Sequence, residues 1–218
     1  MHLDRVTVRE SAYLGVFCSV TDALALVPND ISKKELANIK AFDVEIIRAK
    51  VADSCLFGVL MRGAGNKFVV PDLLNRHEED FFSSKGIELL KIGNKAYGNL
   101  MAMNSRGGMV SGIVERKDFE KIKAFFGIHL IHSNFSCTEL IGSSIVASDK
   151  GFIVNPEISQ EEFSNLSCLF GVKGKATTAN YGDIFVGNDV IANSNAVFVG
   201  SYTTAKEIMH IDEGLRGE

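Results

Sequence analysis

The sequence predicts an α/β fold, a closed ring of five ββαβ repeats, on three observations. Five glycines recur at nearly even intervals of about 40 to 45 residues. A helix start follows seventeen residues after each glycine, with an acidic residue three positions later in every copy. The fifth repeat ends before its third strand, while an unassigned strand precedes the first. A period of about 40 residues indicates a repeat architecture, in which each unit buries its apolar face on its neighbours. The glycines are Gly15, Gly58, Gly98, Gly142 and Gly187.

The fourth repeat shows the pattern of one unit most clearly. Residues 143–147 are predicted as a strand, 148–151 as a turn whose glycine is free to take a positive φ, and 152–154 as a second strand. Ser159 and Glu162 form a capping box, in which the hydroxyl accepts from the N3 amide and the carboxylate reaches back to the cap. Apolar residues then recur at helical spacing, which predicts an amphipathic helix.

The same signals recur in the other units. Four of the five residues at the helix start are good N-caps; the five are Ser32, Asn75, Glu115, Ser159 and Thr204. The acids three positions later are Glu35, Glu78, Asp118, Glu162 and Glu207. Third strands are expected at 44–48, 87–91, 128–132 and, more weakly, 172–178.

The first strand supplies what the last repeat lacks. Residues 3–9 alternate in character, with Val6 and Val8 on one face. The fifth third strand would fall at about residue 216, where the sequence ends. We therefore expect 3–9 to pair into the last unit and close the ring, because closure removes exposed sheet edges.

Composition excludes several classes of protein. The chain carries 23 basic and 27 acidic residues, a net charge of −4, which disfavours a general nucleic-acid binder and suits basic protein partners. No signal peptide or membrane-spanning run is recognised, which predicts a cytoplasmic protein. The four cysteines form no C-x-x-C pair and are expected to be buried small apolar residues. His129 and His132 point to opposite faces of a strand, so neither a metal site nor a cofactor is predicted.

Four strings in this order resemble translation initiation factor 6, the ribosome anti-association factor, and its archaeal branch most. They are YGNL at 97–100, SDKGFIVNP at 148–156, TANYG at 178–182 and ANSNAVFVGSYTT at 192–204. The resemblance implies the pentein fold, an α/β propeller with pseudo-fivefold symmetry. It also implies a single domain whose repeats span about 12–54, 55–95, 96–138, 139–183 and 184–215, the last completed by 3–9.

The resemblance further implies a function. Members of that family bind the large ribosomal subunit near the sarcin-ricin loop, through ribosomal proteins and rRNA, and prevent small-subunit joining. They also act in large-subunit biogenesis and are not enzymes. A monomer without membrane contact is expected.

Two alternatives remain open at this stage. One is an enzyme of the same fold acting on guanidino substrates, in which the nucleophilic cysteine lies near the C-terminus; here no cysteine follows Cys168. The other is a protein-binding ring with no ribosomal role.

A binding face is predicted where the repeats disagree. The residue after the leading glycine is Val16 or Val59 in units one and two, but Asn99, Ser143 or Asn188 in units three to five. For Asn99 a contact role and local hydrogen bonding weigh evenly, and for Ser143 the local role is preferred. The candidate ribosome-binding residues are Asn99, Asn180, Tyr181, Gly182, Asn188, Thr203 and Thr204.

The chain departs from the family pattern at three positions. Lys67 replaces a glycine in the second turn, Asn155 replaces a histidine before a proline, and Tyr202 replaces an aspartate ahead of the paired threonines. These changes are expected at turns and on the surface, so they bear on individual contacts and not on the fold.

Overall fold

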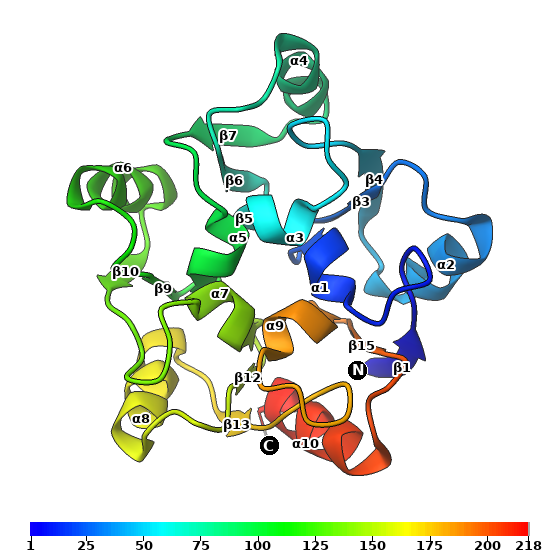
Figure 1. Ribbon diagram of the computed structural model, residues 1–218, viewed down its shortest axis with the longest axis vertical. Coiled ribbons are helices and arrows are strands. Elements are labelled where there is room, and N and C mark those ends of the chain that lie inside the picture. Colours follow the sequence, from blue (N-terminus) through cyan, green and yellow to red (C-terminus); the bar gives the residue numbers. More distant parts are fainter. Residues whose placement is uncertain (218) are drawn as a thin grey trace.

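The computed structural model describes residues 1–217, in which five three-stranded sheets surround a common centre (Figure 1). A longer helix lies outside each sheet, and a four-residue helix at the inner end of each unit lies near the centre of the molecule. The outer helices are α2 (Lys33–Asn38, continued by the 3-10 turn Ile39–Phe42), α4 (Arg76–Ser84), α6 (Arg116–Phe126), α8 (Gln160–Phe170) and α10 (Ala205–Arg216). The inner helices are α1 (Leu14–Phe17), α3 (Phe57–Leu60), α5 (Tyr97–Leu100), α7 (Ile141–Ser144) and α9 (Val186–Asp189).

Every sheet has the same topology: its first two strands are antiparallel, and the third lies parallel to the second. A parallel neighbour that follows in the chain requires a crossover, which the outer helix provides in the first four units; in the fifth unit the parallel strand comes from the start of the chain. The first four sheets are β2 (Ser19–Val20), β3 (Leu24–Pro28) and β4 (Glu45–Ala49); β5 (Arg62–Ala64), β6 (Lys67–Val70) and β7 (Glu88–Lys91); β8 (Met101–Met103), β9 (Gly107–Val110) and β10 (His129–His132); and β11 (Ile145–Ala147), β12 (Phe152–Val154) and β13 (Gly174–Ala176).

The fifth sheet joins the two ends of the chain, as the sequence predicts. It contains β14 (Val190–Ala192), β15 (Ala196–Gly200) and the first strand, β1 (His2–Val6). β1 pairs parallel to β15, in register from His2 opposite Ala196 to Val6 opposite Gly200. The strand ends at Val6 and not at residue 9, because Arg9 and Glu10 adopt left-handed φ angles that turn the chain into α1. Val6 and Val8 are both buried.

Capping boxes begin four of the outer helices, as expected. Ser32, Asn75, Ser159 and Thr204 each accept from the N3 backbone amide, and the N3 glutamate accepts from the cap. The remaining outer helix, α6, has Glu115 at its N-cap position and no side-chain cap, since a glutamate side chain is a poor N-cap. Its N3 acid, Asp118, pairs with Lys121 at 3.0 Å.

The leading glycines correct the predicted start of each unit. They lie inside the short helices, and the first strand begins later, at Ile145 rather than Ser143 in unit four. The glycine of the predicted turn at 148–151 also differs from expectation, because Gly151 does not have a positive φ. A Cβ on Gly151 would clash with the backbone of α10 at Gly214, so that glycine is required by packing.

Close backbone packing explains why the leading residue is glycine in every unit. A Cβ on any of the five would come under 3.0 Å from the carbonyl oxygen of the preceding unit's glycine, with Gly15 meeting Gly187. Each short helix contacts the next along the chain, and α9 contacts α1. The five glycines therefore form a complete circle of backbone contacts at the centre of Figure 1.

Candidate functional site

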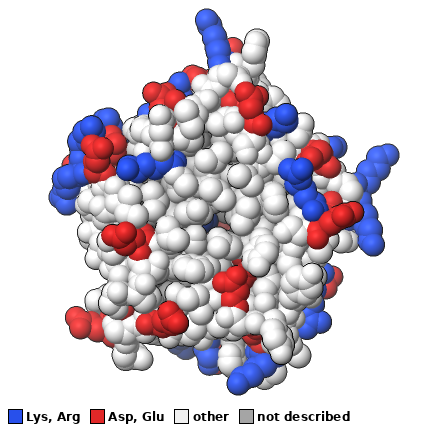
Figure 2. Space-filling model, viewed as in Figure 1, with Lys and Arg blue, Asp and Glu red and all other residues white. Residues whose placement is uncertain are grey.

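The face that carries the short helices is uncharged at its centre. Figure 2 shows white surface over the middle of this face, with lysine, arginine and acidic side chains gathered toward the rim. Asn99 lies on α5 and Asn188 on α9, and both are half-buried. Helix α7 contacts both α5 and α9, so units three to five are contiguous on this face.

The side-chain amides of Asn99 and Asn188 make no hydrogen bond to any other residue of 1–217. Only their backbone amides are bonded, to the carbonyls of Ala96 and Phe185. Their amide groups are therefore available to a partner, and the local hydrogen-bonding role considered from the sequence does not apply. Ser143, the equivalent residue on α7, is only 3% exposed, so it does not contribute a contact surface.

The other five candidates meet at the entrance to unit five. The backbone amide of Asn180 donates to Thr203 Oγ1 at 3.2 Å, and Thr203 is buried. Thr204 is the N-cap of α10. Tyr181 is 84% exposed and Gly182 is exposed as well, so these two residues carry the outward surface of the group.

Glu207 holds this entrance together. Its carboxylate accepts from the amides of Thr204 at 2.7 Å, Gly182 at 2.8 Å and Tyr181 at 3.3 Å, and from the hydroxyl of Thr178 at 2.7 Å. Burial alone raises the pKa of a carboxyl group, but these hydrogen bonds outweigh it and the pKa of Glu207 is lowered. Sequence reasoning identified Glu207 as a capping acid only.

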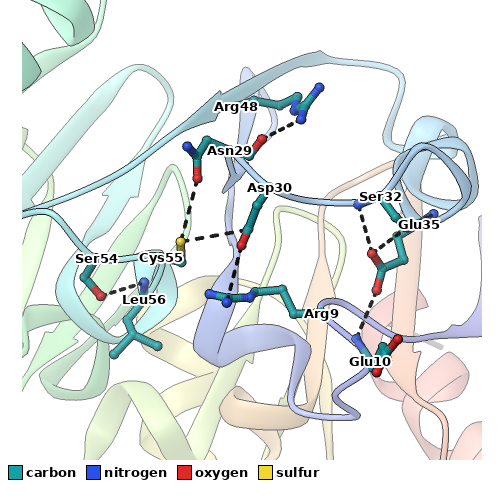
Figure 3. A network of polar contacts seen from close by, with 10 residues as sticks. All are labelled: Arg9, Glu10, Asn29, Asp30, Ser32, Glu35, Arg48, Ser54, Cys55 and Leu56. Carbon is teal, nitrogen blue, oxygen red and sulfur yellow. Dashed lines mark hydrogen bonds and ion pairs between the residues drawn. The ribbon is translucent and has the colours of Figure 1, made fainter.

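The same double role is found in unit one, as Figure 3 shows. There Glu35 accepts from Ser32 at the helix start and from the backbone amide of Glu10 in the preceding loop at 3.2 Å. In these units the acid at N3 of the outer helix therefore accepts hydrogen bonds both from the helix cap and from a backbone amide of the loop that precedes the short helix of the same unit. The left-handed φ angles of Asn180 and Tyr181 also have counterparts in Arg9 and Glu10 and in Ala52 and Asp53, so this strained pair recurs at the start of units one, two and five.

Asp189 is the buried acid of this region and was missed from the sequence. Its Oδ1 accepts from Asn180 Nδ2 at 2.7 Å, and its Oδ2 has no partner in the described chain. Burial and then the charge of Asp183 raise the pKa of Asp189 to about 8. The same Asn180 amide donates to the carbonyl of Ala12 at 2.9 Å, so this side chain connects the loop before α9 to the loop before α1.

The three departures from the family pattern occupy separate places. Lys67 donates to the carbonyl of Phe125 on α6 at 3.1 Å, which links units two and three. Asn155 is buried and accepts from the amide of Glu157 at 2.8 Å, which shapes the turn before α8. Tyr202 is 71% exposed and adds an aromatic surface near α10.

The cysteines do not resemble activated nucleophiles. Burial raises the pKa of the Cys18 thiol, which favours its neutral form. Cys55, half-buried, lies 3.9 Å from oxygens of Asn29 and Asp30 (Figure 3). Cys137 and Cys168 are exposed, so the expectation that the cysteines are buried apolar residues is wrong for these two.

Comparison with known proteins identifies the family. A sequence profile of the eIF-6 family matches residues 3–214. The chain belongs to the eIF-6 family. It is 34% identical to translation initiation factor 6 of Pyrococcus horikoshii, with 99% of each chain covered. It is 30% identical to that of Staphylothermus marinus, covering 100% of this chain and 99% of the relative, and 27% identical to that of Sulfolobus acidocaldarius, with 99% of each covered.

Membership in the eIF-6 family assigns the chain to a class of translation factors, as the resemblance predicted. The five repeated sheets and the paired chain ends are thus the scaffold of an eIF-6 family member. No helix within residues 1–217 is long and apolar enough to cross a bilayer.

Proposed function

We propose that this protein binds the large ribosomal subunit and prevents its association with the small subunit. The match of the eIF-6 family over residues 3–214 carries the proposal, together with the names of the full-length relatives. In this proposal the chain is a single-domain monomer of five repeats with the closed pentein-type ring. It acts in the cytoplasm as a non-catalytic steric blocker and also serves large-subunit biogenesis.

The uncharged face of the short helices is the proposed contact surface. A large interface excludes water from its centre, where charged groups are depleted and satisfied polar groups give specificity. Asn99 and Asn188 offer free amide groups on this face, and Tyr181 and Gly182 extend it toward α10. Asn180, Thr203 and Thr204 are proposed to hold the loop that presents Tyr181.

The chemistry of the partner follows from the charge of the chain. A net charge of −4 favours contacts with basic ribosomal proteins in addition to rRNA near the sarcin-ricin loop. A specific interface of this kind should bury at least about 1,000 Å². Because few phosphates are neutralised, binding should weaken only moderately with salt, by less than the 10³-fold or greater loss that about six phosphate contacts produce.

Sucrose-gradient sedimentation tests the proposal. Purified protein mixed with large and small subunits should travel with the large subunit and reduce the peak of joined ribosomes. Unimpaired joining with the protein in excess would refute the anti-association function. A steep dependence of binding on salt would instead overturn the expected share of protein contacts.

A further inference from the structure

Two connected hollows lie along the axis of the five sheets. The inner one has a volume of about 40 Å³ and is lined by Arg62 and by first-strand residues of several units. The outer one, of about 270 Å³, lies at the turns that follow the first strands, which is the end of these strands away from the short helices. The two share lining residues, among them Gly63, Met103 and Ala147, so they lie next to each other.

Arg62 is the only charged residue that lines the inner hollow within the described chain. Its Nη2 donates to the carbonyls of Gly98 at 2.8 Å and Gly142 at 3.3 Å. Its Nε is buried and has no hydrogen-bond partner, and none of the ion pairs among residues 1–217 involves this guanidinium. Burial lowers the pKa of Arg62 to about 10, so the side chain remains charged at neutral pH.

The surrounding protein does not supply a counter-charge for this cation. The two carboxylates that line the outer hollow belong to Asp22 and Asp149, and both accept hydrogen bonds from residues of neighbouring turns. Asp22 accepts from the amide of Ser194 at 2.6 Å and from its hydroxyl at 2.9 Å, and Asp149 accepts from the amide of Ser105 at 2.9 Å. Arg62 as a whole residue is half-buried, but its Nε is enclosed, and an enclosed charged donor without an acceptor is unfavourable. A backbone carbonyl carries only part of a negative charge.

We propose that the inner hollow binds a small monovalent anion, of which chloride is the physiological example, against Arg62. The unused Nε–H of Arg62 points to this role, because it is a charge-assisted donor without an acceptor. A water molecule needs roughly 10–15 Å³ measured in this way, so 40 Å³ admits a monatomic ion with one or two waters. A phosphate ion, with five heavy atoms, exceeds that space, and the carboxylates at the mouth repel a multiply charged anion.

Anion binding here would stabilise the centre of the protein. Arg62 belongs to unit two, and it is already bonded to the leading glycines of units three and four. An anion at Nε would offset the cost of enclosing the Arg62 charge, while the Nη2 contacts that join three of the five units are kept. The bound ion therefore acts on folding stability, separately from any contact on the face of the short helices.

Thermal unfolding at constant ionic strength tests the proposal, with chloride replacing gluconate stepwise. A ligand that binds only the folded state should raise the melting temperature by about 3–5 °C for each tenfold increase above its dissociation constant. Arg62→Met should abolish the difference between chloride and gluconate. Arg106→Met is the matched control, because Arg106 also donates to a carbonyl, that of Gly171, but from an exposed position; its chloride response should equal that of the unsubstituted protein.

Anomalous diffraction from crystals of the unsubstituted protein grown in bromide gives an independent test, which decides the matter if Arg62→Met does not fold. The proposal requires a bromide peak in contact with Arg62 Nε. Coincident chloride and gluconate curves together with water alone in the inner hollow would overturn it. A chloride response that persists in Arg62→Met would overturn it as well.

Discussion

Replacing Gly98 by alanine tests whether the circle of glycines holds the five units together. A Cβ at this position would come under 3.0 Å from the carbonyl oxygen and carbon of Gly58 and from the carbonyl carbon of Val59. All three are backbone atoms, so no side chain can rotate away to relieve the clash. The carbonyl of Gly98 in turn packs against Gly142, and a displacement would be passed to the next unit.

The expected cost follows from this geometry. Overpacking that side chains can accommodate destabilises by about 1–3 kcal/mol, and a backbone obstacle should reach or exceed the upper end of that range. About 3 kcal/mol is a sizeable share of a total stability of roughly 5–15 kcal/mol. For a chain of this size it corresponds to a fall in melting temperature of roughly 6–12 °C.

Chemical denaturation of Gly98→Ala and of a matched control measures the effect. The control is Gly112→Ala, where a Cβ would meet only the side chain of Asn134, at 3.0 Å or more, and no backbone atom. Asn134 is hydrogen-bonded to Ser111, to the Gly112 amide and to Glu139, so a smaller loss of stability is expected there. Both variants lose the same glycine freedom in the unfolded chain, a gain of about 0.4–1 kcal/mol that cancels in the comparison. Equal stability of the two variants would refute the argument that the leading glycines are required by backbone packing.

Three further predictions concern the chain ends and the acids of unit five. Deleting residues 1–10 removes the pairing of β1 with β15 and the burial of Val6 and Val8, worth about 1.5–3 kcal/mol each; an unchanged melting temperature would contradict this account. The free energy of unfolding of Asp189→Asn should rise relative to that of the unsubstituted protein as pH increases from about 5 to 8, by at most about 1.4 kcal/mol per pH unit. The cause is the raised pKa of Asp189, because the folded state retains a proton that the unfolded state has lost. Parallel pH profiles of the two proteins would exclude this cause. Glu207→Gln should destabilise at neutral pH, and the difference should vanish as pH falls through the lowered pKa of Glu207, since that stability requires the carboxylate; a difference that persists in acid would show that charge is not the cause.

Local signals in the sequence predicted much of the fold. The capping boxes at Ser32, Asn75, Ser159 and Thr204 place the outer helices, because a hydroxyl or amide followed by an acid three residues later satisfies helix-end amides locally. The pairing of β1 with β15 is a long-range contact, but it followed from counting strands in each unit. Repetition therefore made a non-local pairing predictable from local patterns.

The short helices at the centre were not predictable in the same way. Residues such as 141–144 have no helical periodicity, and a four-residue helix is held mainly by its neighbours. The reason for Gly142 is a carbonyl oxygen of another unit, which no local pattern reveals. The predicted start of the first strand, directly after each of these glycines, was wrong for that reason.

The candidate residues fall into two groups, those whose polar side-chain groups are unused and those whose hydrogen bonds are made inside the protein. A sequence string does not separate a residue that faces a partner from one that supports it. Thr203 and Asn180 make their side-chain hydrogen bonds inside the protein, which favours a supporting role for them. Asn99 and Asn188 remain candidates because their amides are unused, which only the coordinates reveal. Arg62 carried no signal, since an arginine in a short strand is usually solvated.

The central claim is that the protein holds the large ribosomal subunit through the face of the short helices. Co-sedimentation with large subunits tests it directly when the double variant Asn99→Ala, Asn188→Ala is compared with the unsubstituted protein. Both residues are half-buried without side-chain hydrogen bonds, so folding stability should change by no more than about 0.5 kcal/mol per site. Ser143→Ala, at the equivalent buried position of α7, is the control and should bind normally. We predict weakened binding by a double variant that melts like the unsubstituted protein; undiminished co-sedimentation of that variant would contradict the assignment of this face.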